Sequence, residues 1–279
     1  MINEKHTLTF AFIGGGNMAS ALSAGLIGKR CAASDVLVID PVETVRQRWQ
    51  DLGTQTAATV TEQLAQQRIW IVAVKPQHMK EVLLQCQPHV KDDTLIISVA
   101  AGIAAQNIAQ WLAQHGKPHQ RVIRAMPNTP AFIGCGATGL MALAAVEPND
   151  KLIAETVFKT VGEFVWVDND QAIDAVTALS GSGPAYVFLF LEALIAGAVH
   201  QGLSPEQARK LAFATLSGAT ELAALSPLPL SHLRDNVTSK GGTTAAALDV
   251  FNQNGFSELV QKAMDAAQHR AAELAQEFS

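Results

Sequence analysis

The feature that most constrains this sequence is a glycine-rich turn between a predicted buried strand and a predicted helix. Residues 14–19 read GGGNMA and fit the pattern G-x-G-x-x-[GA]. In this context Gly14 permits a tight turn, Gly16 lets the backbone approach a pyrophosphate, and Ala19 allows close packing of the helix on the strand. The free N–H groups at the start of the helix then face the anion. The turn therefore predicts a dinucleotide-binding domain.

Short apolar segments alternate with segments of helical composition through the first half of the chain. The apolar segments lack polar alternation, as expected for strands with both faces covered. This β–α–β order predicts an α/β Rossmann-type fold, with a doubly wound parallel sheet and right-handed crossovers. The predicted strands are residues 8–13, 36–39, 69–74, 95–99, 122–125, 138–142 and 164–167, and the predicted helices are residues 18–29, 42–52, 78–84, 104–113 and 148–160.

The sequence changes character near Asp168, after which it is rich in Ala, Leu and Glu. We therefore predict a dinucleotide-binding domain over residues 1–167 and an all-α domain over residues 168–279. Pro184 and Pro205 stand where a first helical position is expected. Several helices are apolar around much of their circumference, so they must be buried within the chain or against a partner. This pattern predicts an oligomer. The helices predicted in this half are residues 184–201, 205–225, 243–251 and 256–278.

Composition and charge exclude several classes of protein. The 279 residues are 48% hydrophobic with a net charge of −5, which excludes global disorder and argues against a nucleic-acid partner. Cys31, Cys86 and Cys135 form no CxxC pair, so neither a zinc site nor a disulfide framework is indicated. The longest apolar stretch, residues 187–199, is interrupted by Glu192 and is too short to span a bilayer. We expect a cytoplasmic protein with no bound metal and no membrane contact.

Two charged residues follow predicted strands, at the edge where open α/β sheets bind ligands. Asp40 follows the second strand, where an acidic residue can hold the ribose hydroxyls of a dinucleotide. Residues 40–43 read DPVE, which also resembles a helix start with Asp40 as N-cap, and one side chain can serve both roles. A carboxylate would repel a 2′-phosphate, which favours NAD unless Arg46 or Arg48 folds back. Lys75 follows the predicted strand at residues 69–74 and is placed either to reach the cofactor or to lie solvated in a loop.

A second polar motif precedes a predicted helix in the second half. Residues 236–244 read NVTSKGGTT. Glycines and hydroxyls at a helix N-terminus suit a carboxylate ligand, although a Thr-capped helix would have the same composition. Residues 179–186 read LSGSGPAY, which indicates an ordinary helix start through Ser, Gly and Pro. The sequence has no nucleophile–base pair, paired carboxylates or metal-ligand spacing that stands out.

The chain resembles the pyrroline-5-carboxylate reductases over nearly its whole length. The motifs that carry this resemblance are FIGGGNMA, AVKPQ, SVAAG, RAMPNTP, LSGSGPAYVF and NVTSKGGTT, in that order. The resemblance implies reduction of (S)-1-pyrroline-5-carboxylate to L-proline by NAD(P)H, the last step of proline synthesis. It also implies an N-terminal Rossmann domain and a helical C-terminal domain that forms a homodimer by interleaving helices. Dimers of this family often assemble further into rings.

The resemblance implies site residues by position. Thr244 corresponds to a hydroxyl that contacts the substrate nitrogen, in a loop contributed from the partner subunit's side, so that dimerisation builds the site. Asp40 stands where many NADP-preferring members carry Ser, Asn or a basic residue, and residues 59–61 (TVT) replace an Asn, so NADPH and NADH both remain open. The cofactor contacts that the resemblance implies are Gly14, Gly15, Gly16, Asn17, Met18, Val74, Lys75, Ala101 and Asn236, whereas the ribose contact of Asp40 is predicted from its place after the second strand. The substrate contacts are Ser239, Gly242, Thr243 and Thr244.

Two other classes share parts of this pattern. A β-hydroxyacid dehydrogenase would carry a catalytic Lys and a partner Asn on a helix of the second domain, and Lys210, Lys240 and Lys262 occupy no such motif. A non-enzymatic dinucleotide sensor would have no use for the anion loop at residues 239–244. A protonated imine is already a strong electrophile, so an imine reductase mainly has to align it with the nicotinamide. This agrees with the lack of a conspicuous catalytic acid.

Overall fold

The computed structural model describes residues 8–278, which form two compact units. The first contains residues 8–182 together with residues 267–278, and the second is Gly183–Ala266. The returning segment is packed closely into the first unit, because a Cβ atom on Gly102 would lie 2.9 Å from the Cβ atom of Leu274. The units thus separate after Ser182, whereas the sequence predicts a domain boundary after residue 167.

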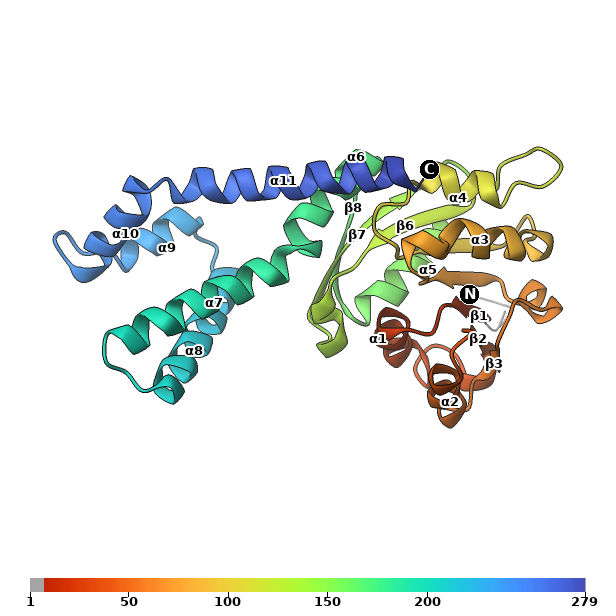
Figure 1. The fold of residues 1–279 in the computed structure, drawn as a ribbon, viewed down its shortest axis with the longest axis horizontal. Helices are drawn as coiled ribbons and strands as arrows, with labels where there is room; N and C mark the ends of the chain where they lie inside the picture. The colour runs from red at the N-terminus through yellow and green to blue at the C-terminus, as the bar shows by residue number, and fades with distance from the viewer. Residues whose placement is uncertain (1–7, 279) are drawn as a thin grey trace. The chain divides into compact units, whose positions relative to one another are not determined.

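An eight-stranded sheet forms the centre of the first unit (Figure 1). Its order is β3-β2-β1-β4-β5-β6-β7-β8, which reverses direction between β1 and β4. The carboxyl ends of these two parallel strands therefore lie at a topological switch point, where open α/β sheets bind ligands. The Rossmann-type class is confirmed. The strands are β1 Phe10–Ile13, β2 Val36–Ile39, β3 Gln55–Ala57, β4 Ile69–Val72, β5 Leu95–Ser98, β6 Val122–Met126, β7 Gly136–Ala142 and β8 Gly162–Trp166.

Helices cover both faces of this sheet (Figure 1). Strand β1 shows why, because all four of its side chains are buried and successive side chains point to opposite faces. Phe10 and Phe12 belong to the core beneath α1, α2 and α5, and Ala11 and Ile13 to the core beneath α3 and α4. The helices are α1 Asn17–Leu26, α2 Glu43–Asp51, α3 Pro76–Cys86, α4 Ala105–Trp111 and α5 Pro148–Lys159.

Part of the topology differs from the predicted parallel order. β7 runs antiparallel to β6, and β8 then pairs parallel with β7. Residues 127–135 connect β6 to β7 and are too few for the crossover of about a dozen or more residues that parallel neighbours need. The sequence pattern also assigns no bounds to β3 and misses two short helices, α6 Asp170–Val176 and α9 Leu230–Asn236.

The motif LSGSGP does not begin a helix, contrary to the helix start that its sequence predicts. Helix α6, a π-turn at Thr177–Gly181 and α7 Gly183–His200 form one continuous helix, Asp170–His200, so Pro184 lies inside it. A proline there cannot donate to the carbonyl of Ser180. The side-chain amide of Asn128 donates to that carbonyl instead, at 3.0 Å. The side chain from the loop after β6 thus satisfies a group that the proline leaves open.

The long helix is also apolar enough to raise the question of a membrane. By length and a mean hydropathy of 1.6, Asp170–His200 is one helix that could cross a bilayer, a test that core helices of soluble proteins also pass. Its first turns are bound to the sheet of the first unit, since Arg124 of β6 pairs with Asp170 at 2.6 Å and with Asp174 at 3.3 Å. These ion pairs also explain why α6 belongs to the first unit.

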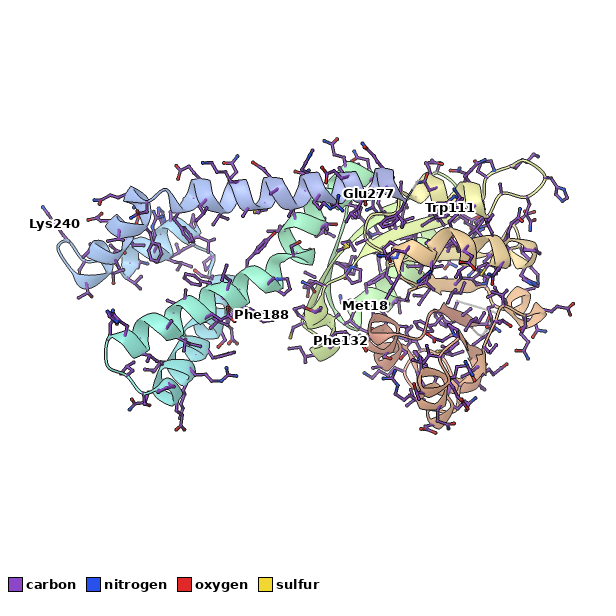
Figure 2. The ribbon with its side chains drawn as sticks, in the orientation of Figure 1. Met18, Trp111, Phe132, Phe188, Lys240 and Glu277 are labelled. Carbon is purple, nitrogen blue, oxygen red and sulfur yellow. The ribbon has the colours of Figure 1, made fainter. Side chains whose placement is uncertain are left out.

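The second unit buries very little apolar surface. Its buried apolar side chains among the described residues are Leu191, Ala208 and Ala212. Large side chains are instead exposed, such as Phe188 of α7, labelled in Figure 2, which is 60% exposed. An apolar cavity of about 660 Å³ lies among α7, α8 and α11. A unit with this surface requires a covering partner. Its remaining helices are α8 Pro205–Leu225, α10 Thr243–Gln253 and the first half of α11 Phe256–Glu277.

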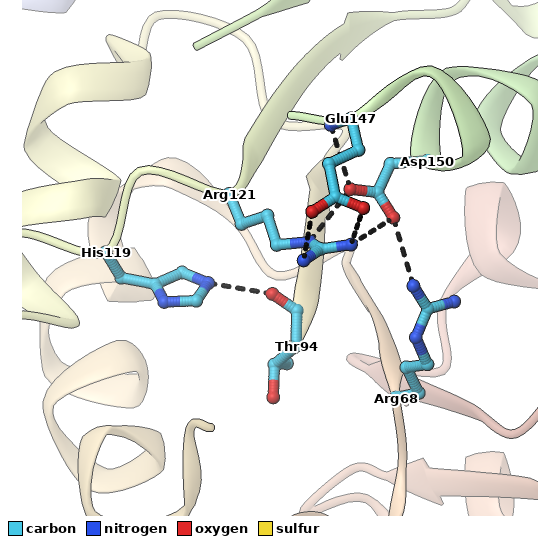
Figure 3. Close-up of polar contacts among 6 residues, drawn as sticks. All are labelled: Arg68, Thr94, His119, Arg121, Glu147 and Asp150. Atoms are coloured by element: carbon cyan, nitrogen blue, oxygen red, sulfur yellow. Dashed lines mark hydrogen bonds and ion pairs between the residues drawn. The ribbon is translucent and has the colours of Figure 1, made fainter. Parts of the chain in front are cut away.

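A buried ion cluster ties α5 to the sheet (Figure 3). The fully buried carboxylate of Asp150 accepts hydrogen bonds from Arg121 Nε at 2.8 Å and from Arg68 at 3.2 Å. It also accepts the backbone N–H of Glu147 at 3.1 Å. The bond to Asp150 raises the pKa of Arg121. Arg68 and Arg121 directly precede β4 and β6, so the cluster lies at the amino ends of the strands, away from the ligand-binding edge.

We predict that Asp150→Ala lowers the free energy of unfolding of the first unit by about 3–5 kcal/mol, because it leaves two arginines without their buried partner. Urea unfolding followed by circular dichroism measures this. Glu147→Gln is the matched control: its side chain is 61% exposed, so the loss should stay below about 1 kcal/mol. Equal losses in the two variants would contradict the assignment.

Candidate active-site residues in the two units

The glycine-rich turn has one closed side and one open side. Gly14 has a φ of +93°, and a Cβ atom there would lie 2.8 Å from the carbonyl oxygen of Ala73, so glycine is required. A Cβ atom on Gly16 would meet nothing within 4 Å. The first turn of α1 has neither an acidic residue nor a side-chain cap, so its N–H groups remain for an anion. The turn therefore fits the pyrophosphate of a dinucleotide.

The middle residue of the turn is held at both ends of its backbone. The N–H group of Gly15 donates to Asp40 Oδ2 at 2.9 Å, and its carbonyl accepts from Trp49 Nε1 at 2.9 Å. Both bonds are buried, and a Cβ atom on Gly15 would lie 2.7 Å from Trp49 Nε1. The sequence gives no sign of this role for Trp49, because a tryptophan on a helix is equally suited to the core.

Asp40 is not the N-cap of α2, contrary to one of its predicted roles. The helix begins at Glu43 with Val42 as N-cap and no side-chain cap. Asp40 Oδ1 instead accepts the N–H of Val42 at 2.9 Å, two residues along the chain, in an Asx-type turn. Arg46 folds back over this turn and donates to the carbonyls of Asp40 and Pro41, both at 2.8 Å. The ribose contact of Asp40 stays a prediction.

The other predicted cofactor residues of this unit follow β4 and β5, which are neighbours in the sheet. Val74 lies against the glycine-rich turn, since its nitrogen would be 3.0 Å from a Cβ atom on Gly14. The exposed side chain of Lys75 forms no ion pair with any described residue, and Lys75 is the N-cap of α3. Ala101 is half-buried after β5. One edge of the sheet therefore carries the glycine-rich turn together with Asp40, Val74 and Lys75.

The predicted substrate residues lie in the second unit, around the start of α10. The N-cap of α10 is Gly242, and no side chain caps the helix, so a Thr-capped helix is excluded. The N–H of Gly242 donates to the carbonyl of Ser239 at 3.0 Å. Within the described part of the chain, the hydroxyls of Ser239, Thr243 and Thr244 have no hydrogen-bond partner and remain available. Lys240 is at the loop tip (Figure 2). The predicted residues in this region are Asn236, Ser239, Gly242, Thr243 and Thr244.

The first unit thus has a turn open to a pyrophosphate at a β1/β4 switch point, followed by a helical unit with an uncapped helix start. These features fit a dinucleotide-binding protein with a second anion site in its helical unit. Residues 170–274 match the family model for pyrroline-5-carboxylate reductase dimerisation. Residues 9–102 match a second family model, which is described as "NADP oxidoreductase coenzyme F420-dependent". The chain belongs to the pyrroline-5-carboxylate reductase family and is an oxidoreductase that uses NAD(P)H.

Relatives match the chain over its length. The pyrroline-5-carboxylate reductase of Pseudomonas aeruginosa is 40% identical over 98% of both chains. That of Haemophilus influenzae is 38% identical over 97% of this chain and 98% of the relative. A solved reductase from Coxiella burnetii has a TM-score of 0.88 at 35% identity, covering 97% of this chain and 99% of that one. The Plasmodium falciparum enzyme with NADP bound has a TM-score of 0.83 at 29% identity, covering 98% and 100%.

We predict that Gly16→Ala weakens binding of NADPH at least about tenfold, since its Cβ atom occupies the open side of the turn. The free energy of unfolding should stay unchanged because that Cβ atom meets no protein atom. Isothermal titration calorimetry and urea unfolding measure the two quantities. Gly14→Ala is the contrasting control and should destabilise the fold. Unchanged NADPH affinity in Gly16→Ala would show that the pyrophosphate does not approach this glycine.

Proposed function

We propose that this chain reduces 1-pyrroline-5-carboxylate to L-proline by hydride transfer from NAD(P)H, the last step of proline biosynthesis. The observation that carries the proposal is the similarity to reductases of this name over 98% of the chain. The open glycine-rich turn and the uncapped start of α10 supply the two kinds of anion site that the reaction needs, one for a pyrophosphate and one for a carboxylate.

The reaction needs alignment more than acid–base chemistry. NAD(P)H, when bound, supplies the hydride, which goes to the carbon of the protonated imine and leaves the proton on the nitrogen of the amine product. The hydroxyl of Thr244 orients this nitrogen. Ser239, Thr243 and the amides at the start of α10, beginning at Gly242, hold the carboxylate. Alignment of two bound reactants contributes as much as about 7–11 kcal/mol to lowering the barrier.

The cofactor occupies the edge of the sheet around β1 and β4. Gly14 to Met18 contact the pyrophosphate, and Val74 and Ala101 line the path towards the nicotinamide. Lys75, exposed and without an ion-pair partner among the described residues, contacts the phosphates or ribose. The resemblance assigns Asn236 to the nicotinamide end. Support comes from the position of these groups in their own units and from the resemblance of their motifs to the family.

The active form is a homodimer built by residues 168–279, the dimerisation and substrate-binding domain. The match to the family's dimerisation model and the exposed apolar helices of the second unit support this. The loop at residues 239–244 comes from the partner subunit's side of the interface. Dimers assemble further into a ring. Because a partner subunit covers the apolar part of Asp170–His200, the protein remains in the cytoplasm without membrane contact.

We predict turnover of 1-pyrroline-5-carboxylate with NADPH, NADH or both, measured as loss of absorbance at the nicotinamide band. Formation of L-proline, detected by mass spectrometry, confirms the product. A folded protein that binds a dinucleotide but does not turn over this imine would favour a dinucleotide sensor or another imine as substrate.

We predict that Thr244→Ala lowers kcat by at least about tenfold, while Kd for the cofactor changes less than twofold, because the hydroxyl orients the substrate nitrogen and not the dinucleotide. Steady-state kinetics and calorimetry give the two values. Thr244→Ser keeps the hydroxyl and should retain most of the activity. Wild-type kinetics in Thr244→Ala would refute the role.

A further inference from the structure

We propose that Arg46 selects NADPH by binding its 2′-phosphate, while Asp40 positions the glycine-rich turn instead of excluding that phosphate. The inference rests on the proposed function only in so far as the chain binds a nicotinamide dinucleotide. It concerns the choice between two cofactors that differ by one phosphate. In the sequence, the acidic residue after β2 favours NAD unless Arg46 or Arg48 folds back, so the choice stays open.

The carboxylate of Asp40 is occupied by the protein itself. Its two oxygens accept the backbone N–H groups of Gly15 and Val42, each at 2.9 Å, and the residue is only 9% exposed. Two amide donors stabilise the negative charge within the fold. The side chain therefore joins the β1–α1 turn to the β2–α2 turn. An acidic residue held in this way is a positioning residue for the cofactor site.

Arg46 brings a positive charge to the same turn. It lies in the first turn of α2, just beyond the end of β2, where a Rossmann fold meets the 2′ position of the ribose. One nitrogen of the guanidinium donates to the carbonyls of Asp40 and Pro41, which fixes the head group against the turn. No ion pair joins Arg46 to any residue between 8 and 278. Its remaining donors are thus available for an added anion.

The chemistry of this head group suits a phosphate. A guanidinium has five N–H donors in a planar fork that matches phosphate oxygens, and only one of its nitrogens is used here. The two carbonyl contacts hold the fork in place before the ligand arrives, so less side-chain freedom is lost on binding. Arg48, two residues further on, is exposed and has no described polar contact, so it offers a matched comparison.

The test separates the 2′-phosphate from the rest of the cofactor. Full-length protein is titrated by calorimetry with adenosine 2′,5′-bisphosphate and with 5′-AMP, then with NADP⁺ and NAD⁺. The wild type should bind the bisphosphate more tightly than 5′-AMP. Arg46→Ala should weaken binding of the bisphosphate and NADP⁺ by at least about tenfold and leave 5′-AMP and NAD⁺ within about twofold. Arg48→Ala should leave all four within about twofold.

Asp40→Ala gives the second readout. Because Asp40 holds Gly15, its loss should weaken NADP⁺ and NAD⁺ by similar factors. A large gain for NADP⁺ alone would show that Asp40 excludes the phosphate and would overturn the proposal. So would an Arg46→Ala variant, folded by circular dichroism, that leaves the bisphosphate unaffected or weakens both fragments equally.

These outcomes remain distinct from failure of the proposed function. A wild-type protein that binds neither fragment nor either dinucleotide refutes both the cofactor assignment and the role of Arg46. A protein that shows the expected pattern of affinities but does not reduce 1-pyrroline-5-carboxylate refutes only the assigned substrate. Arg46→Lys keeps the charge without the planar fork, and an intermediate affinity for the bisphosphate would support recognition by the guanidinium.

Discussion

The hydrogen bond from the Gly15 N–H to the Asp40 carboxylate is the contact on which the cofactor site depends. It joins the loops after β1 and β2, and Trp49 closes the same peptide group from the other end. With Gly15 fixed, Gly14 takes the left-handed turn and Gly16 presents its open side to the ligand-binding edge. The carboxylate of Asp40 thus positions the turn, and the neighbouring Arg46 is the residue that recognises the charge of the 2′-phosphate.

Much of the sheet could be predicted from sequence because its strands are buried on both faces. The bounds of β2 follow directly from the apolar run VLVI, and the doubly wound order follows from the alternation with helices. The features that were missed depend on contacts between distant residues. Helix α6 is set by Arg124 binding Asp170 and Asp174, and the continuous helix through Pro184 depends on an amide from the loop after β6.

In the candidate site too, some features could be predicted from the sequence and others depend on contacts between distant residues. The glycine-rich turn and the loop before α10 stand out because glycines and hydroxyls occur at helix starts. The capping role predicted for Asp40 is wrong, since its carboxylate finds Gly15, twenty-five residues earlier in the chain. Neither Trp49 nor the fold-back of Arg46 leaves a local pattern, because each acts on backbone atoms whose position only the tertiary fold fixes.

The return of α11 to the first unit has a consequence for synthesis on the ribosome. Leu274 packs where Gly102 leaves room, Ala271 is buried, and Phe278 packs against the core beneath α3 and α4. The second unit is therefore an insertion within the first, in the order of the chain. A nascent chain that has already emerged through β8 still lacks part of the core of its nucleotide-binding half. Completion of that half must wait until the entire helical unit has been translated.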